Sequence, residues 1–209
     1  MNSRDEILGR LRERRSAANL PDAWKSERNF PDLVLRFTES LTKVKGEVRR
    51  LENLKSALTE VDRILHEVSA KTVVVNDEPP FSDFSPVERW PTCEWHLAGG
   101  TTGNLRDFCA RADVGLSAVQ GALAETGSLI VHSGDGKSRL ATLLPPVHVA
   151  LVPVSCLVPD IFIWAAARNG EMPANLILIS GPSKSADIEF TLTLGVHGPR
   201  RLIAVLYEG

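Results

Sequence analysis

The run Thr72-Val73-Val74-Val75 constrains the fold most, because four consecutive β-branched residues favour an extended strand. The run lacks alternating polar residues, so both faces of this strand should be buried. It follows a segment, beginning at Asn53, in which apolar residues recur at helical spacing and form one stripe: Leu54, Leu58, Val61, Ile64, Leu65 and Val68. A buried strand directly after an amphipathic helix indicates an α/β fold.

The remaining patterns continue this alternation. A helix begins after Asp32 and ends at Gly46, and residues 47–51 alternate like a short strand. We also expect helices at 105–111, 159–168 and 186–194, and strands at 122–124, 128–131, 148–152, 176–179 and 202–207. The first three of these strands are closely spaced, which favours hairpin or meander connections, and the last two with their helix form a βαβ unit. The prediction is a mixed, Rossmann-like sheet flanked by helices.

Two parts of the chain stand outside this pattern. Residues 76–107 are rich in Pro and Gly and predict an irregular excursion with at most one short strand. Residues 1–28 predict a helical arm and linker, with Ile7, Leu8 and Leu11 on one helix face that must dock on something. The α/β domain is therefore expected over residues 29–209.

Charge and cysteine content exclude several classes of function. Lys and Arg number 24 against 26 Asp and Glu, so no basic field is available to collect nucleic acid. No apolar run approaches the ~20 residues of a membrane span and no signal sequence is visible, which predicts a cytoplasmic protein. Cys93, Cys109 and Cys156 are widely spaced, without the motif of an iron–sulfur or zinc site, so we expect no intrinsic cofactor and no metal.

The first candidate site is a turn between two predicted strands. Glu125, Thr126, Gly127 and Ser128 form it, and Glu125 is its lone charge. An acid at such a junction can act as a nucleophile, as a base or as an acceptor for backbone N–H groups. Alternatively, the turn is a plain hairpin tip in which Gly127 supplies a positive φ.

The second candidate follows the apolar run 176–179. A serine there can cap the helix expected to follow, and exposed amides, hydroxyls and a lysine could hold a phosphate or carboxylate. A plain helix cap explains the same residues, because two acids already occupy the positive end of that helix. The residues concerned are Gly181, Ser183, Lys184, Ser185, Asp187 and Glu189.

Two weaker candidates contain histidines. His197 lies next to Gly198 in a turn before the last strand and is either a catalytic group or a hydrogen-bonded structural residue. Arg139 and His148 flank a proline-containing segment that forms either part of a ligand site or simply a loop entering a strand. Their spacing does not support a metal site, because no His-x-x-x-His pattern is present.

Taken together and in order, these motifs resemble the lactate-utilization (LUD) domain family, whose stand-alone form is called lactate-utilization protein C. The resemblance is carried by residues 122–128, by Arg139 with the stretch from Leu144 to Val149, and by residues 179–189 and 195–199. It covers the chain from the second helix to the end and is most specific from Gly121 onward.

The resemblance implies a fold similar to the sugar-phosphate isomerase and coenzyme A transferase group. It also implies a role in oxidising L-lactate to pyruvate beside two iron–sulfur proteins. Since this chain lacks their cysteine motifs, it would be a non-redox component that binds a small anion, those partners, or both.

Two alternative functions stay open at this point. The chain could be an enzyme that acts on an acyl-coenzyme A or a phosphorylated small molecule, with Glu125 as nucleophile or base. It could equally be an interaction or regulatory module without catalysis, docking through its N-terminal arm.

Overall fold

The computed structural model describes residues 3–14, 24–168, 173, 175–186, 192–194 and 198–209. Its centre is a sheet of six parallel strands in the order β1-β12-β7-β4-β2-β3. These strands are β1 (Glu47–Leu51), β2 (Thr72–Asn76), β3 (Glu94–Ala98), β4 (Val114–Ser117), β7 (Val147–Pro153) and β12 (Arg201–Tyr207). The predicted α/β class is confirmed, and the run 72–75 forms the buried strand β2.

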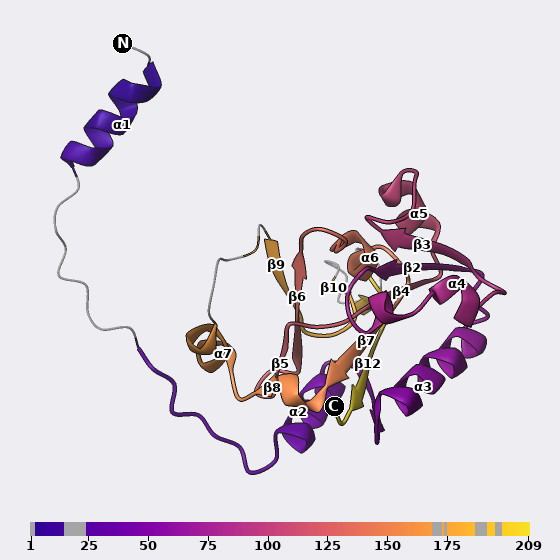
Figure 1. The fold of residues 1–209 in the computed structure, drawn as a ribbon. Coiled ribbons are helices and arrows are strands. Elements are labelled where there is room, and N and C mark those ends of the chain that lie inside the picture. Colours follow the sequence, from indigo (N-terminus) through magenta and orange to yellow (C-terminus); the bar gives the residue numbers. More distant parts are fainter. Residues whose placement is uncertain (1–2, 15–23, 169–172, 174, 187–191, 195–197) are drawn as a thin grey trace.

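One face of this sheet is covered by α3 (Leu54–Glu67) (Figure 1). Asn53 caps the helix, since its Oδ1 accepts the N–H of Ser56 at 2.9 Å. The helix stripe packs with side chains from one face of the central strands in one apolar core, which contains Val61, Ile64, Val73, Val149 and Ile203.

The opposite face is covered by α2 (Leu33–Lys43) and by a second sheet. Asp32 caps α2 by accepting the N–H of Leu35 at 2.9 Å, as the helix start after Asp32 predicts. The second sheet has the order β8-β5-β6-β9 and consists of β5 (Gly121–Leu123), β6 (Ser128–Ser133), β8 (Leu157–Val158) and β9 (Asn175–Ile179). Its β6 pairs antiparallel with both β5 and β9.

Short helices complete the described fold. They are α1 (Ser3–Glu13), α4 (Pro86–Arg89), α5 (Leu105–Arg111), α6 (Leu140–Leu143), α7 (Ile161–Ala167) and the 3₁₀ turns η1 (Phe81–Asp83) and η2 (Val154–Cys156). Helix α1 buries none of its residues and stands apart from the sheets in Figure 1. Among the helices of the described ranges, none has the length and apolar character needed to cross a membrane.

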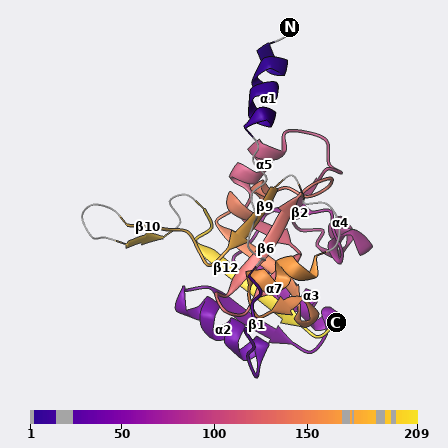
Figure 2. The same ribbon diagram turned by 90° about the vertical axis from the view of Figure 1, so that its left-hand side faces the viewer.

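Two predicted connections are wrong. Residues 122–124 and 128–131 do form a hairpin, but the predicted strand 148–152 belongs to β7 in the parallel sheet, reached through α6. The C-terminal βαβ unit is also absent, because β9 joins the second sheet. Where the helix 186–194 was expected, β10 (Lys184–Ala186) pairs antiparallel with β11 (Leu192–Leu194), and Figure 2 shows β10 projecting from the body.

The strand order fixes where a ligand would be expected. From β2 the chain moves outward to β3, then returns to the other side of β2 and continues through β4, β7 and β12. The connections therefore diverge between β2 and β4. At such a switch point the carboxyl ends of parallel strands leave a crevice that commonly binds ligands. Asn76 ends β2 and Ser117 ends β4.

Candidate functional site

A polar cleft lies over this switch point. Its opening is a cavity of 530 Å³ lined by Ser133, Lys137, Ser138, Arg139, Leu140 and Asn175. Four buried polar side chains lie on or near the ends of β2 and β4 beside it, those of Asn76, Glu78, Ser117 and His148, and Asn76 contacts the lining residue Ser138. We call these ten residues the switch-point cleft.

Backbone contacts fasten the loop between β6 and α6 onto the end of β2. Asp77 N–H donates to the carbonyl of Gly136 at 2.8 Å, and Ser138 N–H donates to Asn76 Oδ1 at 3.0 Å. Gly136 has a φ of +69°, and a Cβ on it would lie 3.0 Å from the Cβ of Asp77. A glycine is required for this close approach, which sets Lys137 and Arg139 at the mouth of the cleft.

Glu78 is the acid among these buried side chains. Its Oε1 accepts the N–H of Ala118 at 3.1 Å, which ties the segment after β2 to the end of β4. Burial raises the pKa of Glu78, while the Ala118 N–H and the charge of Lys137 act in the opposite direction. Lys137 also donates from Nζ to His132 Nε2 at 3.3 Å. Lys137 thus contacts the imidazole of His132 and lies close enough to Glu78 to lower its pKa.

His148 lies beneath this surface with no exposed area. Its Nε2 is 2.9 Å from Ser117 Oγ. Burial lowers the pKa of His148 to about 3, so the imidazole is neutral at physiological pH. A neutral imidazole between two central strands can hold Ser117 in place without bringing a charge into the core.

Three buried polar atoms of the switch-point cleft have no hydrogen-bond partner in the described structure. Buried polar groups are nearly always paired, so each such atom calls for an explanation. The atoms are Ser133 Oγ, His148 Nδ1 and Asn175 Oδ1. Ser133 and Asn175 are direct partners in the β6–β9 register, so two of the three lie on neighbouring strands.

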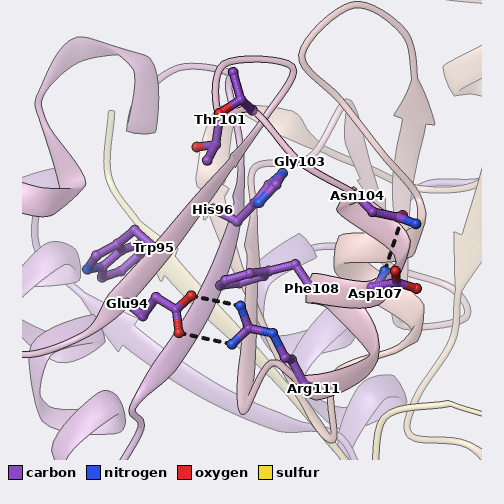
Figure 3. A pocket seen from close by; sticks show the side chains of 10 residues that line it. Glu94, Trp95, His96, Thr101, Gly103, Asn104, Asp107, Phe108 and Arg111 are labelled. Atoms are coloured by element: carbon purple, nitrogen blue, oxygen red, sulfur yellow. Dashed lines mark hydrogen bonds and ion pairs between the residues drawn. The ribbon is translucent and has the colours of Figure 1, made fainter.

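A second hollow of 350 Å³ lies beside the edge strand β3. Figure 3 shows it between β3, the loop 101–104 and α5, and we call it the edge pocket. Arg111 holds Glu94 through two hydrogen bonds of 2.9 and 2.7 Å, and its guanidinium lies 4.4 Å from the ring centre of Phe108. Asn104 caps α5 by accepting the N–H groups of Arg106 and Asp107.

The edge pocket is therefore largely satisfied by its own residues. His96 is nearly buried and packs its ring 4.9 Å from Phe108. Burial and the charge of Arg111 lower the pKa of His96, so this imidazole is also neutral. An incoming anion would have to displace Glu94 from Arg111, which makes this hollow the weaker candidate.

The Glu125 turn has the hairpin geometry expected of it. Gly127 has a φ of +67°, and a Cβ there would lie 2.3 Å from the backbone nitrogen of Leu41, so the turn packs directly on α2. Ser40 Oγ donates to the carbonyls of Ala124 and Glu125 at 3.0 Å each. The carboxylate of Glu125 forms an ion pair with Arg28.

A chain of hydroxyls joins this turn to the next predicted segment. Ser128 Oγ lies 2.7 Å from Thr126 Oγ1 and 2.6 Å from Ser180 Oγ. The structure therefore brings together the first two motifs named above. His148 lies elsewhere, in β7 against Ser117.

The helix start predicted after Gly181 is not found in the described residues of this segment. Lys184 and Ser185 lie in strand β10, and residues 187–191 lie outside the described residues. The anion site itself stays a prediction. Ser183 N–H donates to the carbonyl of Pro199 at 2.8 Å, and Gly198 packs against Ser183 and near the carbonyl of Leu143. This segment thus lies at the C-terminal end of α6, whereas Arg139 directly precedes the other end of that helix, beside the cleft.

Three candidate residues, Asp187, Glu189 and His197, lie outside the described residues. Of the other candidates, Arg139 lines the opening of the switch-point cleft and His148 is one of the buried side chains beside it. The roles assigned to all these residues remain predictions.

Comparison with known proteins supports the resemblance seen in the motifs. The model of the LUD domain matches residues 34–207. This chain belongs to the LUD domain family.

Two curated relatives of this LUD domain align over all or nearly all of its length, and a third aligns over about half of it. Lactate utilization protein C of Halalkalibacterium halodurans is 33% identical over 226 aligned residues, spanning 100% of this chain and 96% of the relative. The protein of the same name from Bacillus subtilis is 29% identical and spans 99% of this chain and 96% of its own. An uncharacterized protein of Neisseria meningitidis is 41% identical over 103 residues, 46% of this chain and 43% of the relative.

A solved structure shares the fold. The crystal structure of a DUF162 family protein from Deinococcus radiodurans superposes with a TM-score of 0.57 at 19% identity, covering 84% of this chain and 96% of that one. At this identity the likeness concerns the architecture of the LUD domain alone.

Several residues of the cleft in this LUD domain were missed from the sequence. Asn76 ends the buried strand β2 and Glu78 lies two residues after it, and polar residues at a strand's carboxyl end are a known signal in parallel sheets. Lys137 could have been noticed beside Arg139. Ser133 and Asn175 gave no local signal, because only the long-range pairing of β6 with β9 brings them together.

Proposed function

We propose that this LUD-domain chain takes part in lactate utilization and binds a small anion in the switch-point cleft. The pathway is supported by relatives named lactate utilization protein C, one of which aligns with the entire chain. The proposed place of binding is supported by the chemistry of the cleft.

The observation that carries this proposal is the presence of two cations at the opening of one cavity beside the switch point. Lys137 and Arg139 line this cavity together with the polar residues Ser133, Ser138 and Asn175. Charge-assisted hydrogen bonds to a carboxylate or phosphate are the strong interactions that such cations form. A small anion in this cavity would lie beside both cations.

We further propose that the chain is a non-redox component. The three cysteines are free, and burial raises the pKa of each thiol, so none has the character of an activated thiolate. Any redox centre of the system would then be carried by an iron–sulfur partner. The exposed apolar residues of α1, among them Ile7 and Leu11, offer a docking segment for such a partner.

The alternative with Glu125 as an acyl acceptor has less support. Its carboxylate is paired with Arg28, and its carbonyl is engaged by Ser40 and by Arg36 at 3.4 Å. A nucleophile needs an adjacent base or a shifted pKa and a free approach to substrate. The Glu125 turn instead has the contacts of a residue that fastens the hairpin to α2.

Isothermal titration calorimetry tests the proposed site. We expect L-lactate to bind the wild-type protein, and Lys137→Met and Arg139→Met each to weaken binding about tenfold or more, because a charged hydrogen bond is lost. Arg111→Met in the edge pocket is the matched control and should leave the affinity unchanged. Equal affinity in all four proteins would remove the switch-point cleft from the proposal.

The pathway is tested separately, by deleting the gene. Growth on L-lactate as sole carbon source should be lost and should return with a plasmid-borne wild-type copy. Unchanged growth would contradict participation in lactate utilization while leaving the anion site to be judged by calorimetry.

A further inference from the structure

We infer that strand β9 (Asn175–Ile179) is an interface, and that it pairs antiparallel with β9 of a second copy of this chain. This interface is separate from the anion proposed for the switch-point cleft, and either can fail without the other.

Strand β9 forms one edge of the second sheet. Among the described strands it pairs with β6 alone, and Figure 1 shows it on the side of β6 away from β5. No backbone hydrogen bond between described residues engages its other side. Alternate residues of an antiparallel edge strand direct their N–H and C=O groups away from the sheet, and such an unpaired row is a template for another strand.

The other two edge strands of five residues are protected. β1 carries the charges of Glu47, Arg49 and Arg50. At β3 the following turn closes on the strand, since Thr101 Oγ1 accepts the N–H of Leu97 at 2.8 Å and Thr101 N–H donates to the carbonyl of Leu97 at 2.9 Å. Charges and covering loops are devices that prevent edge pairing. The sequence of β9, Asn-Leu-Ile-Leu-Ile, contains neither a charge nor a proline, so this edge is open to pairing.

The sequence of β9 is also complementary to itself. An antiparallel pair centred on Ile177 sets Leu176 of each copy opposite Leu178 of the other, and Ile177 opposite its own counterpart. Asn175 of each copy then faces Ile179 of the other. No like charges meet in this register. Contact of one surface with itself across a twofold axis is the commonest form of assembly, which favours a second copy as the partner.

The side chains of β9 suit a joined sheet on both of its faces. Ile177 and Ile179 pack in the apolar core between the two sheets, and Leu176 packs with the cluster of Trp164 on the outer face. Leu178 lies on that same outer face, because alternate residues share a face, and its side chain is 44% exposed in the single copy. Pairing would cover Leu178 with Leu176 of the second copy and remove apolar surface from water.

The pairing would also extend one wall of the switch-point cleft. Ser133 and Asn175, direct partners in the β6–β9 register, both line its cavity. In the register centred on Ile177, the second copy places Ile179 opposite Asn175. Each copy would therefore lie beside the cavity of the other, as twofold symmetry requires.

Analytical ultracentrifugation over a series of protein concentrations measures this assembly. Two short strands bury little area compared with a standard interface of about 1,600 Å², so we expect a reversible dimer. As the concentration rises, the mass should approach twice the 22.8 kDa of the chain. Leu178→Lys should weaken the dimer about tenfold or more, because it places a charge in the paired edge. Leu35→Lys, the same change at a leucine that is 56% exposed on α2, is the matched control and should leave the dimer unchanged.

Disulfide trapping tests the register of the pair. Directly opposite residues of antiparallel strands have Cβ atoms about 4.5–5.5 Å apart, close to the spacing that a disulfide needs. Ile177→Cys should therefore give a cross-linked dimer under mild oxidation. Leu178→Cys has the more exposed side chain but should cross-link much less, because its counterpart lies two residues from the position opposite it. The wild-type chain, whose three cysteines are free, gives the background.

Three results would overturn this interface. They are a wild-type protein that stays monomeric at every concentration, a dimer that Leu178→Lys leaves intact, and stronger cross-linking of Leu178→Cys than of Ile177→Cys. The wild-type mass alone can refute the interface, so a variant that fails to fold does not protect it. Binding of L-lactate is not among these measurements, and they therefore leave the proposed function to its own tests.

Discussion

The switch-point cleft and the edge pocket are both polar hollows that carry a buried histidine and a cation. They differ in how their polar groups are paired. In the edge pocket Arg111 donates two hydrogen bonds to Glu94, and Asn104 caps α5. The polar side chains of this pocket are therefore paired with one another. In the cleft, Ser133 and Asn175 each retain a buried atom without a partner. This difference in hydrogen-bond pairing separates the two hollows.

Topology supports the same distinction. The edge pocket lies beside β3, the last strand of the sheet, whereas the cleft lies where the connections diverge between β2 and β4. Divergence leaves the strand ends uncovered by crossover segments, so ligand groups can approach there.

The largest expected difference concerns the two histidines and acid stability. The folded pKa of His148 is about 3, below its ordinary 6.5, so between these values the unfolded chain binds a proton that the folded chain does not. The contribution of neutral His148 to the free energy of unfolding should therefore be fully present above about pH 6.5. It should be lost progressively as the pH falls toward 3, at a slope approaching about 1.4 kcal/mol per pH unit. Urea unfolding at a series of pH values measures this.

His148→Leu should flatten that profile, and His96→Leu in the edge pocket should flatten it less. Glu78 changes the free energy of unfolding with pH in the opposite direction to His148, because burial raises its pKa in the folded protein. Acids with a lowered pKa, such as Asp113 and Asp160, change the free energy of unfolding at lower pH. A profile for His148→Leu as steep as that of the wild type between pH 5 and 6.5 would show that His148 is not held neutral in the folded protein.

An intermediate effect is expected for one asparagine in each hollow. Asn76→Ala leaves the N–H of Ser138 without its acceptor, so it should cost about 1–3 kcal/mol of stability and weaken L-lactate binding. Asn104→Ala removes a helix cap and should cost about 1 kcal/mol with no change in affinity. Thermal unfolding and calorimetry on the two variants measure both quantities, and an affinity that depends on Asn104 would reverse the ranking of the hollows.

The smallest effect is expected at the rim of the edge pocket. Glu94→Gln breaks the paired hydrogen bonds with Arg111, but both side chains are exposed, and exposed ion pairs contribute little to stability. The melting temperature and the L-lactate affinity should both match the wild type. A gain of anion binding on releasing Arg111 would show that the edge pocket is a site held closed by Glu94.

Local patterns predicted the local structure well. The strand 47–51 and the helix 105–111 were predicted with the bounds observed for β1 and α5, because their apolar spacing and flanking residues suffice. The positive φ of Gly127 was likewise predictable from the turn. Each of these features depends on neighbours within a few residues.

Non-local features were predicted poorly. The predicted helix 186–194 is wrong at its described ends, Ala186 and residues 192–194, because the acids and cap serines were given more weight than the alternation Leu192-Thr193-Leu194, which forms β11. The cleft was missed because strand order decides which loops meet, and no local pattern states that β9 pairs with β6 or that β4 lies beside β2. Arg139 and His148 were selected, but not for their shared location.

The central claim, that the switch-point cleft and not the edge pocket binds a small anion, is tested most directly by titrating the ¹⁵N-labelled protein with L-lactate and following its amide signals. We predict saturable shifts for Ser133, Lys137, Ser138 and Arg139, with Thr101 to Asn104 unmoved. Saturable shifts confined to Thr101 to Asn104, or none at any lactate concentration, would contradict it.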